Sequence, residues 1–514
     1  MGGGPDRSAS GGGAADRLPG PSGGWAVGGG PDRSASGGGA ARSRVLRLAV
    51  PALAALAVEP LFVMVDSAIV GHLGRAPLAG LALAGTVLDT CVYLCVFLAY
   101  ATTGQVARSF GAGRMHDAVR RGVDALWLAL GLGLALEAGL LLAGRRLLGL
   151  FGPDAAVGGA AWVYLSWSAL GLPAMMVVLA AVGVLRGLQN TKVTFHVALA
   201  GGLCNAGVSY LLCYPAGWGI KGSALGTVIS QVLMALWAGG LVVRAATREV
   251  VTLKPGSAGV WAQARAGAPL LLRTCCLRGA GLATLWVATS FGAVELAAHQ
   301  IVSNVWAFAA LCTDALAIAA QALVGATLGA REAQGDAGLA AGDGAGGGAG
   351  GRGAGGGGGG AGRGAGGGGG GGRGAGGTSA AGSLVEVKRV VVRLSVAAGA
   401  GLGALTAAVS WLLPSAFTAD SAVRGAATGA LLATAACMPL AGWAFALDGI
   451  LLGAGHNAFL AKGMAIALAC YLPVALAIRF LAVGPAGLAL LWAGYGGAFM
   501  LARALFYRRR AGSV

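Results

Sequence analysis

Acidic side chains inside long apolar segments are the residues of this sequence most able to do chemistry. Asp66, in EPLFVMVDSAIVGHLG, and Asp448, in WAFALDGILLG, are each flanked by apolar residues, and Pro60 loosens the chain before Asp66. An aspartate at the centre of a membrane helix costs about 2.5–3.5 kcal/mol on insertion scales, so such a residue usually has a function. A desolvated carboxylate can bind and release a proton. We expect Asp66, and secondarily Asp448, to couple proton or cation movement; an interfacial or structurally paired acid is the alternative.

Other polar and aromatic residues in apolar segments are candidates for pairing or for lining a cavity. Neighbouring helices, or Arg273 and Arg278, could satisfy Asp89 and Asp314. The remaining acids in these segments are Glu59, nearest an Arg-bearing terminus, and the weaker candidates Asp124 and Glu137. His299 is interpreted as a proton relay or as a packed, hydrogen-bonded histidine. Four aromatic residues either line a substrate cavity or pack in the core and against lipid: Tyr93, Trp286, Trp306 and Phe308.

The segments that carry these residues are apolar enough to span a membrane. Apolar residues make up 56% of the chain and charged residues only 11%, and the mean hydropathy is +0.75. Soluble domains carry about 25% charged residues. Backbone groups in lipid must be paired within helices or closed barrels, and the apolar runs are long and do not alternate. The sequence therefore predicts an all-α membrane protein. Twelve transmembrane helices are expected near 45–71, 77–110, 117–143, 157–185, 192–215, 220–245, 264–291, 294–330, 384–413, 421–453, 457–480 and 483–507.

The net charge of +17 is distributed as in a membrane protein. With the amino terminus in the cytoplasm, most Lys and Arg residues fall in loops on the cytoplasmic side, as the positive-inside rule requires. Both termini are therefore predicted to be cytoplasmic, or on the equivalent face of an organelle. This distribution argues against a nucleic-acid partner. The cysteines have no C-x-x-C spacing, and no metal or cofactor is expected.

Two segments of low complexity should not fold. Residues 1–44 are rich in Gly, Ser, Ala and Arg, repeat the string GGGPDRSASGGGAA, and form either a duplicated tail or an organellar transit peptide. Residues 335–382 are rich in glycine and repeat RGAGG, which predicts a flexible loop. No aromatic residue separates its arginines for base stacking, so an RNA-binding role is disfavoured.

An internal repeat divides the rest of the chain into two halves. PLAGLALAG at 77–85 aligns with ELAAHQIVS at 295–303, and QVARSFGAG at 105–113 aligns with LVGATLGAR at 323–331. The two alignments are displaced along the chain by the same number of residues, which we call the first offset. VLRGLQN at 184–190 aligns with LLGAGHN at 451–457 at a larger, second offset, and the difference between the offsets matches the Gly-rich insertion. Six spans return the chain to its starting face, so the halves share one orientation. We expect lobes at 45–250 and 264–510, joined by the loop 251–263 and related by a pseudo-two-fold axis along the membrane normal.

The motifs within these lobes resemble those of the multidrug and toxic compound extrusion (MATE) transporters, in particular the DinF-like and plant plastid-type branch. The resemblance is carried by DSAIVGHLG, LAGLALAG, LAAHQIVSNVWAF, AAQALVGATLGA and VLRGLQNTK. It implies two six-helix lobes and a secondary active antiporter. Such a protein exports a small organic solute (an organic cation, a xenobiotic or an organic anion) by alternating access, in exchange for H⁺ or, less favoured, Na⁺.

The resemblance also implies a coupling site in the amino-terminal lobe. The first-span acid of the family falls on Asp66, and the fifth-span asparagine that joins it falls on Asn205. Many members carry an aspartate four residues further on, where this chain has Ser209. One carboxylate in place of two favours H⁺ over Na⁺, because a bound cation would lose a charged ligand. The tenth-span FxxDG pattern falls on Asp448. A monomer in a bilayer is expected, in the plastid envelope or else in the plasma or vacuolar membrane.

Two other functions fit parts of the sequence. A lipid-linked-precursor flippase would need paired basic residues in its cavity, for which Arg273 and Arg278 are the candidates. A membrane-embedded enzyme is disfavoured, because the HExxH motif is absent and an acyltransferase would require an acid beside His299. We expect a transporter and not an enzyme.

Overall fold

The protein is helical throughout the part that its structure, a computed structural model, describes, namely residues 38–345 and 375–512. The helices are α1 (Gly38–Gly71), α2 (Arg75–Cys95), α3 (Phe97–Gly111), α4 (Met115–Gly149), α5 (Ala155–Ala169), α6 (Leu172–Gly187), α7 (Thr191–Cys213), α8 (Ile220–Arg248), α9 (Ser257–Thr289), α10 (Ala293–Ala345), α11 (Ala375–Val409), η1 (Leu413–Ala416), α12 (Ser421–Gly453), α13 (Asn457–Leu481), α14 (Gly484–Ala493), η2 (Gly494–Phe499) and α15 (Met500–Ala511).

These helices form up to twelve membrane spans. Eleven continuous segments of the described residues are long and apolar enough to cross a bilayer, and α5 and α6 form a twelfth span that bends by 52°. The bend lies at Leu170 and Gly171, and Pro173 stands in the first turn of α6, where a proline fits a helix start. The predicted twelve-span, all-α membrane protein is confirmed.

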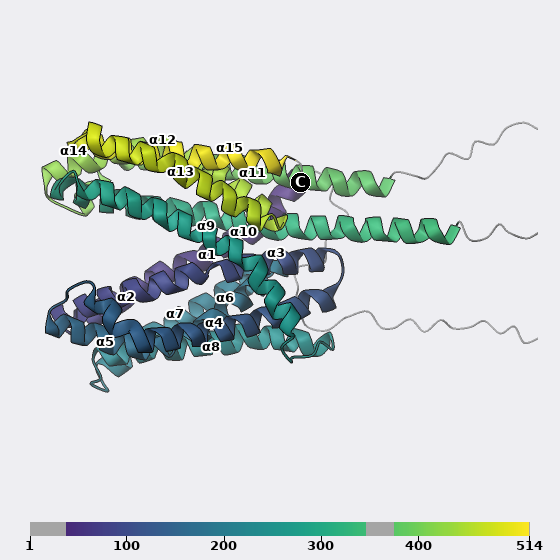
Figure 1. Cartoon of the computed structure of the whole chain (residues 1–514), viewed down its shortest axis with the longest axis horizontal. Coiled ribbons are helices and arrows are strands. Elements are labelled where there is room, and N and C mark those ends of the chain that lie inside the picture. The colour runs from purple at the N-terminus through teal and green to yellow at the C-terminus, as the bar shows by residue number, and fades with distance from the viewer. Residues whose placement is uncertain (1–37, 346–374, 513–514) are drawn as a thin grey trace, which may run out of the picture.

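The spans are grouped in two lobes, as predicted (Figure 1). In the amino-terminal lobe α1 packs on α7, α7 on α8, and α2 on α5; in the carboxy-terminal lobe α12 packs on α10 and α11, and α9 on α13. Helix α9 crosses obliquely toward the amino-terminal lobe and contacts α3 and α4. Helices α3 and α10 make the main contact between the lobes.

The α3–α10 contact shows the two-fold symmetry directly. A β-carbon on Gly111 of α3 would collide with the carbonyl of Ala326, and one on Gly329 of α10 would collide with the carbonyl of Arg108. Gly329 is the counterpart of Gly111 at the first offset, and Ala326 is the counterpart of Arg108. Each helix therefore packs its glycine against the equivalent turn of the other helix, as in a self-complementary interface.

A displacement one residue shorter than the second offset is visible in the packing within each lobe. A β-carbon on Gly183 would come 2.8 Å from the carbonyl oxygen of Ala99, and one on Gly449 would collide with that of Ala317. Gly449 lies one residue before Ile450, the counterpart of Gly183 at the second offset, and Ala317 is the counterpart of Ala99 at the first. The two lobes therefore repeat one packing arrangement, although the Gly-rich insertion interrupts only the second.

Helices extend into both segments for which irregular chain is predicted. Helix α1 begins at Gly38, α10 continues to Ala345, and α11 begins at Ala375. Adding residues to an existing helix costs far less than nucleating one, so the packed spans propagate into the adjoining alanine-rich chain. The rest of the predicted tail and loop, residues 1–37 and 346–374, lies outside the described residues.

Candidate functional site

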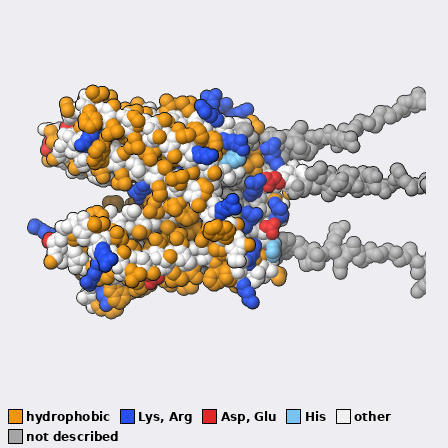
Figure 2. Space-filling model, in the orientation of Figure 1, with side chains coloured by type: hydrophobic (Ala, Val, Ile, Leu, Met, Phe, Trp, Pro, Cys, Tyr) orange, Lys and Arg blue, Asp and Glu red, His pale blue; other side chains and the backbone are white. Residues whose placement is uncertain are grey.

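A cleft separates the lobes at one end of the molecule. We call the end at which α1 begins and α15 ends the terminal face; basic side chains gather there, and the space-filling view is hollowed between the lobes at the opposite end (Figure 2). At the terminal face Arg108 forms an ion pair with Glu332, and the Gln105 amide donates to Gln263 at 2.7 Å. Both contacts join α3 to the carboxy-terminal lobe. The lobes are therefore closed at the terminal face and open away from it.

Helices α2 and α10 have equivalent exposed faces, and the two-fold symmetry of the lobes implies that both border this cleft. The exposed residues Thr86, Asp89 and Thr90 of α2 correspond, at the first offset, to the exposed residues Asn304, Ala307 and Phe308 of α10. All of them lie well inside a membrane span. A charged group facing lipid at the centre of a span costs about 2.5–3.5 kcal/mol, so the polar face of α2 borders water in the cleft.

Asp66 lies inside the amino-terminal lobe, five residues before α1 ends at Gly71. Its side chain is buried, with only 8% of its surface exposed. The Ser223 hydroxyl of α8 donates to Asp66 Oδ1 at 2.7 Å, and the Tyr164 hydroxyl of α5 lies 3.4 Å from Oδ2. Among the described residues no basic side chain forms an ion pair with Asp66. Its partners are therefore neutral donors, which leave the carboxylate free to become neutral by binding a proton.

Asn205 and Ser209 lie on α7, beside this carboxylate. Ser209 is fully buried, and its hydroxyl donates to the carbonyl of Ser223 at 3.4 Å, next to the Ser223 hydroxyl that binds Asp66. The Asn205 amide donates to the Thr227 hydroxyl at 3.0 Å, and Thr227 donates to the Ser223 carbonyl at 3.3 Å. Asn205 is therefore linked to Asp66 through α8 rather than by a direct bond.

The equivalent site of the carboxy-terminal lobe is neutral. Thr284, the counterpart of Asp66 at the first offset, shares a hydrogen bond of 2.7 Å with the hydroxyl of Tyr471. Tyr471 in turn lies one residue before Leu472, the counterpart of Asn205 at the second offset. Both side chains are buried. The repeat thus preserves the α1–α7 pairing in α9 and α13, but only the amino-terminal lobe has a carboxylate at this position.

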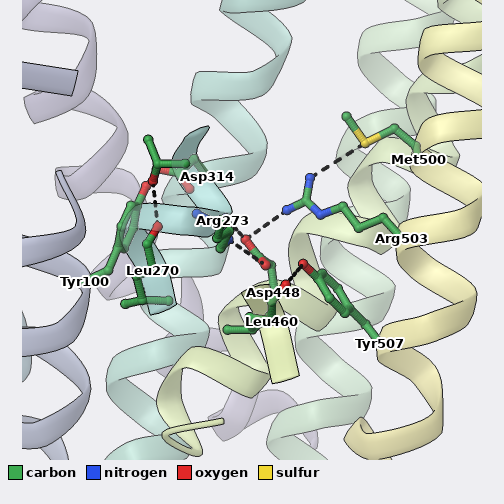
Figure 3. A network of polar contacts seen from close by, with 10 residues as sticks. Tyr100, Leu270, Arg273, Asp314, Asp448, Leu460, Met500, Arg503 and Tyr507 are labelled. Atoms are coloured by element: carbon green, nitrogen blue, oxygen red, sulfur yellow. Dashed lines mark hydrogen bonds and ion pairs between the residues drawn. The ribbon is translucent and has the colours of Figure 1, made fainter. Parts of the chain in front are cut away.

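Asp448 belongs to a separate, buried ionic cluster in the carboxy-terminal lobe (Figure 3). Arg273 of α9 forms hydrogen bonds and an ion pair with its carboxylate, and Arg503 Nη2 of α15 lies 2.8 Å from Asp448 Oδ2, an ion pair without hydrogen-bond alignment. The Arg503 guanidinium also lies over the Phe445 ring, 4.8 Å from its centroid. All three charged side chains are buried. Asp448 is thus paired with two cations, unlike Asp66.

The two aspartates are not brought together. Asp66 is five residues from the end of α1 near the cleft opening, whereas Asp448 is five residues from Gly453, the end of α12 at the terminal face. With a rise of about 1.5 Å per residue, most of the membrane thickness separates them. The structure therefore contains two polar clusters of different chemistry.

A hydrogen bond ties the surroundings of Asp448 to the other lobe. The Tyr100 hydroxyl of α3 donates to Asp314 of α10 at 2.9 Å, and the Arg273 guanidinium lies 5.7 Å from the Tyr100 ring centroid (Figure 3). Arg186 of α6 also attracts Asp314 electrostatically. Charges of alternating sign therefore run from the amino-terminal lobe across the interface to Arg503.

The aromatic and histidine candidates are dispersed. Phe308 is 58% exposed on the cleft face of α10, and Tyr93 of α2 lies under the guanidinium of Arg278. Trp306 and His299 are buried in the carboxy-terminal lobe, and His299 Nε2 lies 3.2 Å from the Ser303 hydroxyl. Trp286 is near the carboxy-terminal end of α9, under the guanidinium of Arg479. Of these candidates, Tyr93 and Phe308 are thus the ones placed to line the cleft.

Sequence reasoning missed Arg503, Tyr164 and Ser223. Arg503 stands five residues before the basic run Arg508–Arg510 and so reads as part of a charged helix end. Tyr507, one helical turn further along the same face of the helix, is the residue that could have indicated that Arg503 is buried. Of the other acids, Asp124 pairs with Arg120 at 2.9 Å, and the side chain of Glu59 lies outside the described residues.

Known proteins share this sequence pattern and this architecture. The MatE family model matches residues 51–211 and 269–337, and the starts of the two matches are separated by the first offset. Protein DETOXIFICATION 44, chloroplastic, of Arabidopsis thaliana is 32% identical over 299 residues, which cover 55% of this chain and 56% of the relative. DNA damage-inducible protein F of Escherichia coli is 28% identical over 301 residues, which cover 55% of this chain and 63% of that protein. The chain thus spans little more than half the length of the curated relatives it matches.

Solved structures share the fold over nearly the whole chain. A crystal structure described as MATE in the bent conformation has a TM-score of 0.76 at 19% identity and covers 93% of this chain and 98% of its own. A structure described as the outward-facing conformation of a multidrug resistance MATE family transporter has a TM-score of 0.75 at 19% identity, with 92% and 96% covered. The two matched segments and the related sequences show that this integral, multi-pass membrane protein is similar to MATE family proteins, and the solved structures show that it shares their two-lobe fold.

Proposed function

We propose that the protein is a proton-coupled antiporter that exports a small organic solute by alternating access, with Asp66 as its proton carrier. The observation that supports this proposal is the environment of Asp66, which is buried near the cleft opening and bonded to neutral hydroxyl groups. A buried carboxylate without a cation is costly to keep ionised, and a proton removes that cost. The two protonation states therefore differ in how well they tolerate closure of the cleft.

The coupling ion follows from the ligands that surround Asp66. A bound Na⁺ is a hard cation that requires several oxygen ligands and is helped by more than one negative charge. Here Ser209 and Ser223 supply hydroxyl groups, and Asn205 is turned toward Thr227. With one carboxylate the site is better matched to H⁺ than to Na⁺.

In this scheme Asp448 has a supporting role in coupling. Its two guanidinium partners belong to α9 and α15, so it joins α9, α12 and α15 as one body. The hydrogen bond between Tyr100 and Asp314 connects that body to the amino-terminal lobe. Rearrangement of this bond would accompany rocking of the lobes, and a change at Asp448 should weaken transport less directly than a change at Asp66.

The site of action that we propose is the plastid envelope. Three of the related Arabidopsis proteins are named as chloroplastic, and the amino-terminal segment has the Arg- and Ser-containing composition compatible with organellar targeting. The solute is a small organic molecule that enters the cleft, and the lipid bilayer is the remaining partner of the monomer.

Reconstitution into liposomes tests the coupling. Uptake of tetraethylammonium, citrate and 4-(aminomethyl)benzoate is measured under an imposed pH gradient and, separately, under a Na⁺ gradient at equal pH. We expect at least one solute to move with the pH gradient and none with Na⁺ alone. Asp66→Asn keeps a hydrogen-bonding side chain of equal size but cannot cycle a proton, so uptake should fall at least tenfold.

The matched control is Asp117→Asn, which removes an exposed acid from the first turn of α4 at the terminal face. It should transport at the wild-type rate. Gradient-driven uptake at the wild-type rate by a well-folded Asp66→Asn protein would remove Asp66 from the mechanism. Uptake driven by Na⁺ at equal pH would refute the choice of ion.

A further inference from the structure

Asp89 and Arg278 are charged cleft residues outside both polar clusters. Asp89 lies on α2 of the amino-terminal lobe, and Arg278 lies on α9 of the carboxy-terminal lobe. Both side chains are exposed, although each stands within a membrane span. At a rise of about 1.5 Å per residue, Asp89 is about 20 Å from the start of α2 and Arg278 about 16 Å from the end of α9. Both therefore lie close to the middle of the bilayer.

The surroundings of Asp89 show that this exposure is to water. Thr86 and Thr90 lie on the same exposed face of α2, so three polar side chains follow one another along it. An ionisable residue at this depth faces a water-filled cavity or another polar group rather than lipid. The Arg278 guanidinium reaches this face from the other lobe. The pair therefore lies where a solute in the cleft would meet it.

Tyr93 fixes the position of Arg278. The guanidinium carbon lies 3.6 Å from the Tyr93 ring centroid, which is a close cation–π contact. Asp89 and Tyr93 are four residues apart and share one face of α2. Stacking holds the guanidinium plane over the ring and leaves its N–H groups at the edge available to an acceptor.

Asp89 and Arg278 are near each other but do not form an ion pair. Arg278 attracts Asp89 electrostatically, yet within the described residues no nitrogen of Arg278 comes within 4.0 Å of a carboxylate oxygen. By contrast Arg273 and Arg503 are both paired with Asp448 and buried. The cleft thus presents one cation and one anion side by side, each able to bind a further charged group.

We propose that this pair recognises a zwitterionic solute, with its carboxylate on the Arg278 guanidinium and its protonated amine on Asp89. This inference rests on the proposed export function and specifies its substrate class. A solute with only a positive charge would be attracted by Asp89 and repelled by Arg278, and the reverse holds for an anion. A molecule that carries both charges on a short, rigid frame satisfies both residues. Because the residues belong to opposite lobes, such a solute bridges the lobes in this state.

Equilibrium binding to the purified full-length protein tests the inference with three probes that share one ring: 4-(aminomethyl)benzoate, benzylamine and benzoate. Titration calorimetry should show the zwitterion binding at least tenfold more tightly than either singly charged probe. Arg278→Gln should reverse the preference toward benzylamine, and Asp89→Asn should reverse it toward benzoate. Arg278→Lys keeps the charge and should retain the zwitterion preference.

The matched control is Arg479→Gln. Arg479 is also stacked on an aromatic ring, 4.0 Å from the Trp286 centroid, but lies near the carboxy-terminal end of α13 rather than at the middle of a span. Its replacement should leave the order of affinities unchanged. Equal affinity for the three probes, or equal loss of all three in both cleft variants with unchanged thermal unfolding, would overturn the inference. Proton-driven transport without zwitterion preference would refute the inference alone, whereas zwitterion-selective binding without any transport would refute the proposed function alone.

Discussion

The stability of the protein should depend strongly on the charge of Asp448 and little on the charge of Asp66. Asp448→Asn leaves the guanidinium groups of Arg273 and Arg503 buried side by side, with the shared anion gone. Removing one partner from a buried ionic cluster costs about 3–5 kcal/mol, because the remaining charges stay uncompensated. A domain of about 150–250 residues loses roughly 2–4 °C in Tm per kcal/mol, so Tm should fall by on the order of 6–20 °C. Asp66→Asn removes a charge with no cation beside it and should change Tm little.

Substitution of Arg503 tests how the charges of the Asp448 cluster contribute to stability. Arg503→Met removes one cation but leaves the Arg273–Asp448 pair intact, so the loss should be smaller, on the order of 1–3 kcal/mol. Combining it with Asp448→Asn relieves the repulsion between the guanidiniums, so the double variant should be more stable than the sum of the two single losses predicts. Thermal unfolding of the detergent-purified protein, followed by the size-exclusion peak that survives heating, measures all four proteins. An Asp448→Asn variant as stable as wild type would show that the two arginines do not depend on this carboxylate.

Three further predictions concern other parts of the chain. Ser209→Asp places a second carboxylate beside Asp66, so Na⁺ should then raise Tm, which a titration of thermal unfolding with NaCl against KCl would detect. Deleting residues 346–374 should leave transport in liposomes intact, because this Gly-rich stretch has too few apolar side chains to bury; a loss of folded protein would contradict that view. Burial, with a smaller contribution from Arg510 and Arg108, lowers the pKa of His456 in the short loop before α13. The folded state therefore favours neutral His456, and stability should be constant above about pH 6.5 and fall below it. His456→Gln should flatten that fall in a pH series of thermal unfolding.

Sequence periodicity predicted the architecture because hydropathy and the repeat are local properties of the chain. The first offset, read from short matches, correctly pairs Gly111 with Gly329 at the contact between the lobes. The same offset identified Thr284 as the counterpart of Asp66. The helix ends were less predictable, since α10 and α11 continue into alanine- and glycine-rich chain. How far a packed helix propagates depends on the stability of the span behind it.

The partners of each acid could not be predicted, because they come from helices distant in the sequence. Asp66 meets Ser223, 157 positions away, and Asp448 meets Arg273, 175 positions away. Composition could identify both aspartates as costly residues in a membrane but could not tell that one is paired with cations and the other is not. That difference sets the proposed roles of the two residues, and it arises only from packing.

The reciprocal contact of Gly111 and Gly329 has a consequence for the origin of the chain. Each glycine meets the backbone of the opposite helix at the equivalent position, so two identical six-helix chains could make the same contact. A homodimer of one half would then have possessed the lobe interface before the halves were joined in one polypeptide. It could not have possessed the present distribution of charge, because identical subunits must carry the same residue at equivalent positions. The carboxylate at Asp66 and the hydroxyl at Thr284 therefore record a divergence that fusion into a single chain made available.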